Sequence, residues 1–282
     1  MPELPEVQTV TSALNSTIKN LVVKRIEIKR KNLRFNIPSN MKTVLPGRKV
    51  VKVYRRAKYG IINFDNGYSI IFHLGMSGSI VIQNQLDFVL GKHDHIIFEF
   101  FDKNKIISCI YRDPRRFGFF LFYKNSSNKF KNYFNKVGQE PLSSKFSIDK
   151  FYKLINSKNT SIKSALLDQR VLAGLGNIYV CESLFLSSIR PTRKCKNLSY
   201  NETKNLYINI VKVLTKAIDE GGTSLKDHKN ISGEIGYFQN FLSVYDKKGK
   251  KCANKNCNML IKKIIQNGRS SFFCQKCQKK YI

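Results

Sequence analysis

Acidic residues are scarce in this chain of 282 residues. Asp and Glu number 19 against 50 Lys and Arg, which gives a formal net charge of +31 and a pI near 10.0. Such a cationic excess goes far beyond what solubility requires and predicts a polyanionic partner. Nucleic acid is the favoured polyanion, although a ribosomal or membrane-surface protein would use the same charge.

Long apolar runs are also missing. No stretch approaches the roughly 18 residues that a membrane-spanning helix needs. The N-terminal region carries acids in place of the basic segment of a secretory signal. We therefore expect a cytoplasmic protein without a membrane partner.

Cysteine is sparse outside the C-terminal segment. Of the seven cysteines, Cys109, Cys181 and Cys195 are scattered, and we expect them to be ordinary buried residues. The other four lie in the last 31 residues, and in a reducing compartment such clustering favours a metal site over disulfides. These four, with x4, x16 and x2 between them, are Cys252, Cys257, Cys274 and Cys277.

The spacing of these four cysteines predicts one structural zinc ion. Each pair supplies two thiolates from a turn, and the intervening segment brings the pairs together in the tetrahedral geometry that Zn²⁺ needs. That segment holds two strand-like runs joined by Asn267-Gly268, a strong hairpin signal, with Arg269 at the tip. A tail this short depends on the metal for folding. On its own it would suit any zinc ribbon that touches phosphates.

The region between residues 22 and 124 is rich in short β-type runs. Tight turns such as residues 65–67 separate them, which predicts an antiparallel sandwich or barrel. Before this region, apolar residues three and four apart from Leu4 to Ile18 predict an amphipathic helix. Beyond about residue 129 helical periodicity takes over, with Asn177 and Asn201 as the expected helix caps.

The predicted fold class is therefore α+β. An N-terminal antiparallel β-sandwich domain flanked by helices would occupy residues 1–130, a helical domain residues 131–240, and the zinc hairpin residues 241–282. Residues 221–245 show no clear period, and a loop of this length in a compact domain is often functional.

A set of motifs resembles those of the bacterial formamidopyrimidine-DNA glycosylases, which remove 8-oxoguanine and ring-opened purines and then cut the strand. The match covers nearly the whole chain and includes the cysteine hairpin. The motifs, in order, are PELPE, RRAKYG, HLGMSG, KHDH, DPRRFG, GLGNIYVCESLF and GGTSLKD. No single motif is decisive, but their order is highly specific.

The resemblance implies a bifunctional enzyme of base excision repair that acts on double-stranded DNA at the bacterial nucleoid, as a monomer. The initiator methionine would be trimmed, and the amine of Pro2 would attack the sugar while Glu3 moves protons. Glu6 would assist. Lys58 and Arg269 would serve the β,δ-elimination steps, although each cation would also suit a phosphate.

The resemblance further implies how the duplex is held. A flipped base leaves a gap, which apolar wedges and planar cations fill. Arg115 suits this position because its guanidinium matches the two acceptors of the unpaired cytosine. The helical domain would be the helix-two-turns-helix DNA-binding domain. The residues assigned to DNA contact are Met76, Arg115 and Phe117 for the gap and His93 and Asn177 for phosphates.

Some features fit the family less closely. The first cysteine pair is spaced x4 where the family usually has x2, which affects the expected zinc affinity and the placement of Arg269. Lys226 and Tyr237 are only weakly indicated as lesion-loop contacts. Taken singly, Met76 and Phe117 would more often be core residues.

Two other functions stay open at this point. An endonuclease VIII-type glycosylase shares the proline nucleophile and zinc hairpin but prefers oxidised pyrimidines; PELPE, KHDH and the pair Arg115 and Phe117 count against it. A noncatalytic, zinc-stabilised nucleic-acid binder would explain the charge and the hairpin, but it gives no role to Pro2 and Glu3.

Overall fold

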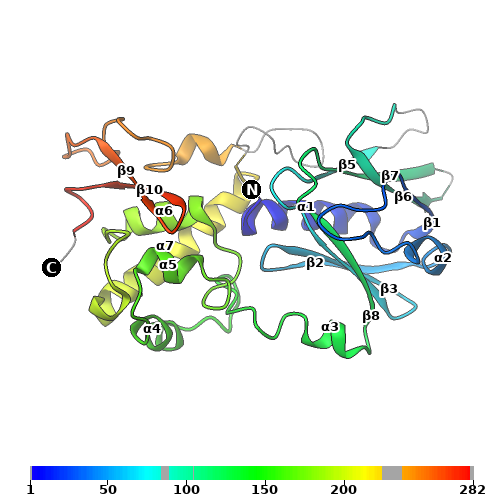
Figure 1. Ribbon diagram of the computed structural model, residues 1–282, viewed down its shortest axis with the longest axis horizontal. Helices are drawn as coiled ribbons and strands as arrows, with labels where there is room; N and C mark the ends of the chain where they lie inside the picture. Colours follow the sequence, from blue (N-terminus) through cyan, green and yellow to red (C-terminus); the bar gives the residue numbers. More distant parts are fainter. Residues whose placement is uncertain (1, 84–88, 104, 224–236, 280–282) are drawn as a thin grey trace. The chain divides into compact units, whose positions relative to one another are not determined.

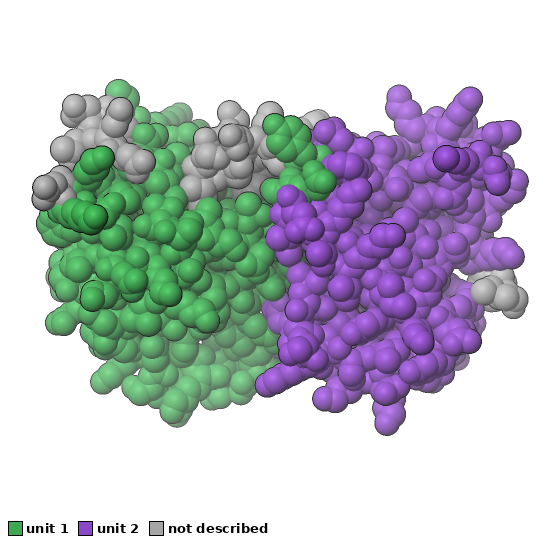
Figure 2. Space-filling view, turned by 180° about the vertical axis from the view of Figure 1, so that it is seen from behind, with its two compact units in different colours: residues 1–135, 220–237 green, residues 136–219, 238–282 purple. Residues whose placement is uncertain are grey.

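A computed structural model describes residues 2–83, 89–103, 105–223 and 237–279. These residues form two compact units, residues 1–135 with 220–237 and residues 136–219 with 238–282, coloured separately in Figure 2. The helical segment and the zinc hairpin thus share a unit, while the division into three domains stays a prediction. No helix within the described residues is both long and apolar enough to cross a membrane.

The first unit contains two four-stranded antiparallel sheets and the long helix α1, Leu4–Ile18 (Figure 1). One sheet has the order β1-β6-β7-β5: Val22–Ile28, Asp94–Asp102, Lys105–Arg112 and Ser79–Gln83. The other has the order β2-β3-β4-β8: Val50–Arg56, Tyr59–Phe64, Tyr68–His73 and Phe119–Lys124. Short helices α2, Met41–Val44, and α3, Asn128–Asn132, also belong to this unit. The predicted antiparallel strands are confirmed.

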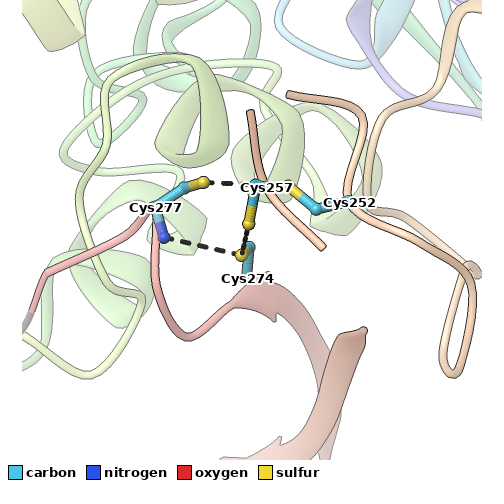
Figure 3. A group of neighbouring side chains, drawn as sticks. All are labelled: Cys252, Cys257, Cys274 and Cys277. Atoms are coloured by element: carbon cyan, nitrogen blue, oxygen red, sulfur yellow. Dashed lines mark hydrogen bonds between the residues drawn. The ribbon is translucent and has the colours of Figure 1, made fainter. Parts of the chain in front are cut away.

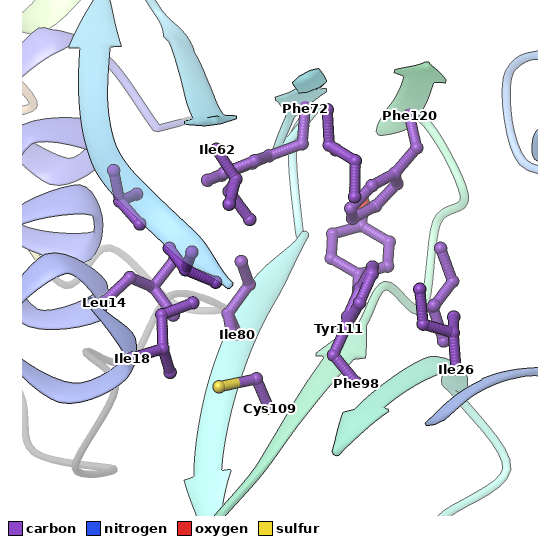
Figure 4. Close-up of a cluster of buried hydrophobic side chains, with 14 of the residues drawn as sticks. Leu14, Ile18, Ile26, Ile62, Phe72, Ile80, Phe98, Cys109, Tyr111 and Phe120 are labelled. Atoms are coloured by element: carbon purple, nitrogen blue, oxygen red, sulfur yellow. The ribbon is translucent and has the colours of Figure 1, made fainter. Parts of the chain in front are cut away.

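An apolar core lies between the sheets and α1 (Figure 4). Successive side chains of a strand point to opposite faces of its sheet, so each sheet contributes side chains to this core, and the three- and four-residue spacing of α1 adds its apolar stripe. Burial of each large aliphatic or aromatic side chain contributes about 2 kcal/mol. Buried members of this core are Leu14, Ile18, Ile62, Phe72, Ile80, Phe98 and Tyr111.

The second unit is helical and ends in the predicted hairpin. Its helices are α4, Ile148–Asn156, α5, Ile162–Leu167, α6, Asn177–Leu186, and α7, Tyr200–Asp219, with 3-10 turns η1, Cys195–Asn197, and η2, Phe238–Phe241. Strands β9, Ile261–Gln266, and β10, Arg269–Cys274, pair antiparallel across Asn267-Gly268. Both turn residues have positive φ, 48° and 71°, as a tight hairpin turn requires.

The two expected asparagine caps are wrong. Gly176 is the N-cap of α6, so Asn177 is the first residue inside the helix. At the start of α7, the hydroxyl of Ser199 accepts a hydrogen bond from the Glu202 amide, and the Glu202 carboxylate accepts one from the Ser199 amide. This reciprocal pair is a capping box, which places Asn201 inside the helix too.

Helix α6 is buried on nearly all sides and carries a buried carboxylate, Glu182. Its two oxygens accept hydrogen bonds from three consecutive amides, those of Ser243, Val244 and Tyr245, at 2.8 to 3.0 Å. Burial raises the pKa of Glu182, and the three amide donors oppose that shift. The contact fastens the segment that leads into the zinc hairpin.

Glu182→Ala should therefore lower the free energy of unfolding by about 3 kcal/mol, because buried amides lose their acceptor. Chemical denaturation followed by circular dichroism measures the change. The matched control is Glu27→Ala, which removes an exposed carboxylate 3.0 Å from Lys29 and should cost less than about 1 kcal/mol. Equal losses would contradict the role given to Glu182.

Candidate active site and zinc centre

The first candidate residues, Pro2 and Glu3, immediately precede α1 and are buried. The amide of Glu3 donates to the Glu6 carboxylate at 2.7 Å, and the Glu3 carbonyl accepts the amide of Val7 at 3.1 Å. Pro2 therefore lies at the positive end of the helix dipole. That field disfavours an ammonium group and lowers the pKa of an amine placed there.

Glu6 anchors a distant segment to this helix start. Its second carboxylate oxygen accepts hydrogen bonds from the amide and the hydroxyl of Thr223, both at 2.9 Å. Gly222 has a φ of +82°, and a Cβ there would lie 3.1 Å from Glu6. The GGTSLKD motif thus needs glycine at this position because the backbone closes directly on a buried carboxylate.

Lys58 lies in the two-residue turn between β2 and β3 and is buried. Arg55 holds this turn against α1: its guanidinium donates to Gln8 at 2.9 Å and to the Ala57 carbonyl at 3.0 Å. Ala57 adopts a positive φ of 53°, which is costly for a residue with a Cβ. The RRAKYG motif therefore fixes the backbone beside Lys58.

His73, which sequence reasoning did not assign, ends β4 near Lys58. Burial, and then the positive charges of Lys58 and Arg34, lower the pKa of His73 from 6.5 to about 4. Its Nδ1 accepts the Gly75 amide at 2.9 Å, which assigns the proton of the neutral ring to Nε2. The ring stacks on Phe119 with centroids 5.3 Å apart. In the sequence, its position as the first residue of the HLGMSG motif could have marked it as a candidate site residue.

The three gap-filling candidates lie on two adjoining loops. Met76 and Phe117 are 38% and 45% exposed, which argues against a core role for either side chain. The Arg115 guanidinium lies 5.1 Å from the Phe117 ring centroid, and the Arg115 amide donates to Ser77 at 3.0 Å. Arg115 and Phe117 also line a cavity of about 590 Å³, together with Leu33, Arg34 and Arg116.

The structure shows less about the other residues of this unit that were predicted to contact DNA. His93 precedes β6, and its backbone carbonyl accepts the amide of Asp113 at 3.1 Å. Tyr237 is 62% exposed, and its amide donates to the Glu220 carbonyl at 2.9 Å. Lys226 lies outside the described residues.

In the second unit, two side chains hold the hairpin directly beside Arg269. Asn177 donates to the Ser270 carbonyl at 2.9 Å, and Lys163 donates to the same carbonyl and to the Ser271 hydroxyl, both at 2.7 Å. Burial lowers the pKa of Lys163. The Asn177 Oδ1 atom is buried and, among the described residues, has no hydrogen-bond partner. Arg269 itself is exposed. Lys163 was missed because its partner lies 107 residues away.

The four predicted cysteines converge on one point (Figure 3). Their sulfur atoms all lie within 4.8 Å of one another, and two pairs are 3.6 and 3.8 Å apart. Tetrahedral zinc with bonds of about 2.3 Å places its sulfurs about 3.8 Å apart. An amide of Met259 lowers the pKa of Cys257 to about 7, and the Cys277 amide donates to Cys274. Such N–H to sulfur bonds favour the thiolate that zinc needs.

Three family models match the chain. They are the formamidopyrimidine-DNA glycosylase N-terminal domain over residues 1–120, its H2TH domain over residues 137–229, and the zinc finger found in FPG and IleRS over residues 249–280. The formamidopyrimidine-DNA glycosylases of Roseobacter denitrificans and of Wolbachia from Drosophila simulans are 39% and 42% identical to it. Each match covers 99% of this chain and 100% of the relative.

Solved structures agree. The complex between the Lactococcus lactis Fpg and an abasic-site DNA matches with a TM-score of 0.88 and 34% identity, over 99% of this chain and 100% of that one. A complex of a variant of that protein with Fapy-dG DNA matches with a TM-score of 0.89, 34% identity and the same coverage. The chain belongs to the formamidopyrimidine-DNA glycosylase family.

Membership in the formamidopyrimidine-DNA glycosylase family confirms several predictions. The α+β fold with antiparallel sheets, a helix-two-turns-helix region and a zinc hairpin is confirmed. One structural zinc at the four cysteines is confirmed by the zinc-finger match and the sulfur cluster. The class of enzyme, a DNA repair glycosylase with lyase activity, is confirmed by relatives about two fifths identical over the full chain.

The low pKa of His73 predicts a pH-dependent stability. Between pH 6.5 and about 4 the unfolded chain binds a proton at this residue that the folded protein does not bind. The free energy of unfolding should therefore fall as the pH is lowered through this window, by up to about 3 kcal/mol. In His73→Gln, which keeps an acceptor, this component should vanish. Urea unfolding of both proteins from pH 7 to pH 4 tests it, and parallel curves would refute the assignment.

Proposed function

We propose that this glycosylase excises oxidised purines, namely 8-oxoguanine and formamidopyrimidines, from double-stranded DNA and then cleaves the abasic strand by β,δ-elimination. The observation that carries the proposal is the position of Pro2 and Glu3, buried at the start of a helix whose first turn is anchored by Glu6. Solved relatives in complex with abasic-site and Fapy-dG DNA support the substrate class. A monomer in the bacterial cytoplasm, working at the nucleoid, completes the proposal.

The nucleophile would be the secondary amine of Pro2 after removal of the initiator methionine. Its reference pKa is about 8, and the helix dipole lowers it toward neutrality. The amine forms a bond to the sugar carbon that carries the damaged base, and the glycosidic bond breaks with its electron pair leaving on the base. The departing base takes up the proton that the amine loses. Glu3 gives a proton to the ring oxygen as the deoxyribose opens, which leaves an iminium on Pro2.

The iminium then drives strand cleavage. It makes the neighbouring sugar protons acidic, so the phosphates on both sides of the lesion leave in turn. Lys58 and Arg269 would stabilise the departing phosphates as cations. Lys58 is held in a turn fastened to α1, and Arg269 follows a hairpin turn secured at Ser270 by Asn177 and Lys163.

The flipped nucleotide would leave a gap that Met76, Arg115 and Phe117 fill. The exposure of the two apolar side chains supports this role, because it leaves them available to enter the stack. The fork of Arg115 would bind the acceptors of the unpaired cytosine, which favours damaged guanine opposite cytosine. His93 and Asn177 would contact phosphates.

The two rival functions make different predictions. An endonuclease VIII-type enzyme would prefer oxidised pyrimidines over 8-oxoguanine in a direct comparison. A noncatalytic binder would form no covalent complex at all. The relatives named as formamidopyrimidine-DNA glycosylases favour oxidised purines over both.

Borohydride reduction tests the nucleophile directly. Protein with a free Pro2 amine, mixed with a duplex containing 8-oxoguanine opposite cytosine, should give a trapped adduct that mass spectrometry maps to Pro2. The matched control is the same protein with an uncleaved N-terminal extension. It should bind the duplex but form no adduct and cut no strand. Strand cleavage by the extended form would contradict the assignment of Pro2 as the nucleophile.

Arg115→Ala should relax the choice of opposite base. A guanidinium fork on one base contributes roughly 1–3 kcal/mol of discrimination, so the ratio of excision opposite cytosine to excision opposite adenine should fall about tenfold or more. Arg116→Ala is the matched control, because it removes the next guanidinium along the chain. Single-turnover excision rates on both duplexes measure the ratio. An unchanged ratio in Arg115→Ala would refute the contact.

A further inference from the structure

Asp113 is a fully buried carboxylate at the first position of the DPRRFG loop. Three donors surround it. Oδ1 accepts the Ser77 hydroxyl at 2.6 Å, and Oδ2 accepts the Gly118 amide at 2.8 Å and the Tyr111 hydroxyl at 3.0 Å. Burial, and then the Asp113 charge, raise the pKa of Tyr111, so its hydroxyl stays a donor.

Two of these donors belong to the loops that carry the gap-filling side chains. Ser77 follows Met76, and Gly118 follows Phe117 in the sequence. The Ser77 hydroxyl also accepts the amide of Arg115 at 3.0 Å. One continuous chain of hydrogen bonds thus runs from the Arg115 backbone through Ser77 to Asp113 and on to Gly118.

The backbone of Asp113 adds a third motif. Its amide donates to the His93 carbonyl at 3.1 Å, and its carbonyl lies 3.0 Å from Nε2 of the buried His95. HLGMSG, KHDH and DPRRFG therefore meet at this one residue. His95 serves this junction, which accounts for the second histidine of KHDH without a metal.

Glycines bring the two loops into direct contact. A Cβ on Gly118 would lie 1.8 Å from the Tyr111 hydroxyl. A Cβ on Gly75, whose φ is +65°, would lie 2.4 Å from the Gly118 nitrogen. Because the two loops are already in close contact at these glycines, a change at Asp113 must also shift neighbouring residues of both loops.

We propose that Asp113 is a positioning residue that sets the placement of Met76, Arg115 and Phe117 relative to one another and thereby determines discrimination of the opposite base. The inference rests on the proposed gap-filling role of these three side chains. Asp113 touches no reacting atom and acts through the two loops.

Asp113→Asn tests the inference with little change in volume. An amide that keeps its oxygen toward Ser77 presents an NH₂ group to the Gly118 N–H, so a donor faces a donor. The ratio of excision opposite cytosine to excision opposite adenine should fall about tenfold, as expected for Arg115→Ala. In the double variant Asp113→Asn, Arg115→Ala this ratio should be no lower than in Arg115→Ala alone. Cleavage of a duplex that already holds an abasic site should change far less than this ratio.

Controls separate positioning from folding. Glu99→Gln changes another buried carboxylate, which pairs with Arg25 at 2.7 Å across β1 and β6, and should leave the ratio unchanged. Loss of activity in equal proportion on all substrates would show a merely structural role and overturn the inference. If Asp113→Asn does not fold, Ser77→Ala tests the inference instead. This variant removes the hydroxyl that hydrogen-bonds both the Arg115 amide and the Asp113 carboxylate, and it should lower the same ratio.

The outcomes also distinguish this inference from the proposed function. An unchanged ratio in Asp113→Asn and Ser77→Ala, with a lowered ratio in Arg115→Ala, would overturn the role of Asp113 alone. Unchanged ratios in all three variants would overturn the gap-filling role, and the inference with it. Absence of excision by the unaltered protein would overturn the proposed substrate.

Discussion

Buried carboxylates that accept hydrogen bonds from distant segments hold this protein together. The chain has 19 acids against 50 basic residues, yet Glu6, Asp113 and Glu182 are at most 3% exposed. Burying a carboxylate costs free energy unless donors surround it, so each one fixes its donors closely. Glu6 reaches Thr223, 217 positions along the chain, and Glu182 reaches three amides 61 to 63 positions along. The excess of 50 basic over 19 acidic residues makes the chain strongly cationic, which suits an enzyme that binds DNA.

The same constraint explains why the candidate catalytic groups lie on rigid elements. A covalent amine catalyst works only if the amine meets the sugar carbon in one geometry. Glu6 fixes the first turn of α1 toward Thr223, and Arg55 fixes the turn that contains Lys58 against Gln8 of the same helix. Groups held by packed helices and strands are placed more narrowly than groups on free loops.

The sequence predicts features whose cause is local. The apolar spacing of α1, the short β-type runs, the Asn267-Gly268 turn and the four-cysteine spacing each depend on neighbouring residues, and the structure contains the elements that all four predict. Features that depend on contacts between residues far apart in the chain could not be predicted from the sequence. Asn177 looked like a helix cap but reaches Ser270, 93 positions away, and the low pKa of His73 depends on burial and on Lys58 and Arg34. Motif resemblance located such residues but did not give their contacts.

The wide first cysteine pair shows how the zinc hairpin tolerates a departure from the family pattern. The two extra residues are taken up by a turn in which the Cys257 amide donates to the Asn254 carbonyl at 3.0 Å, and the Cys252 amide reaches the Met259 carbonyl at 2.9 Å. The sulfurs still converge. Arg269 lies at the other end of the hairpin, where Lys163 and Asn177 bind Ser270 from the helices. Because these two side chains bind the hairpin beside Arg269 and away from the four cysteines, the wider spacing between Cys252 and Cys257 need not displace Arg269.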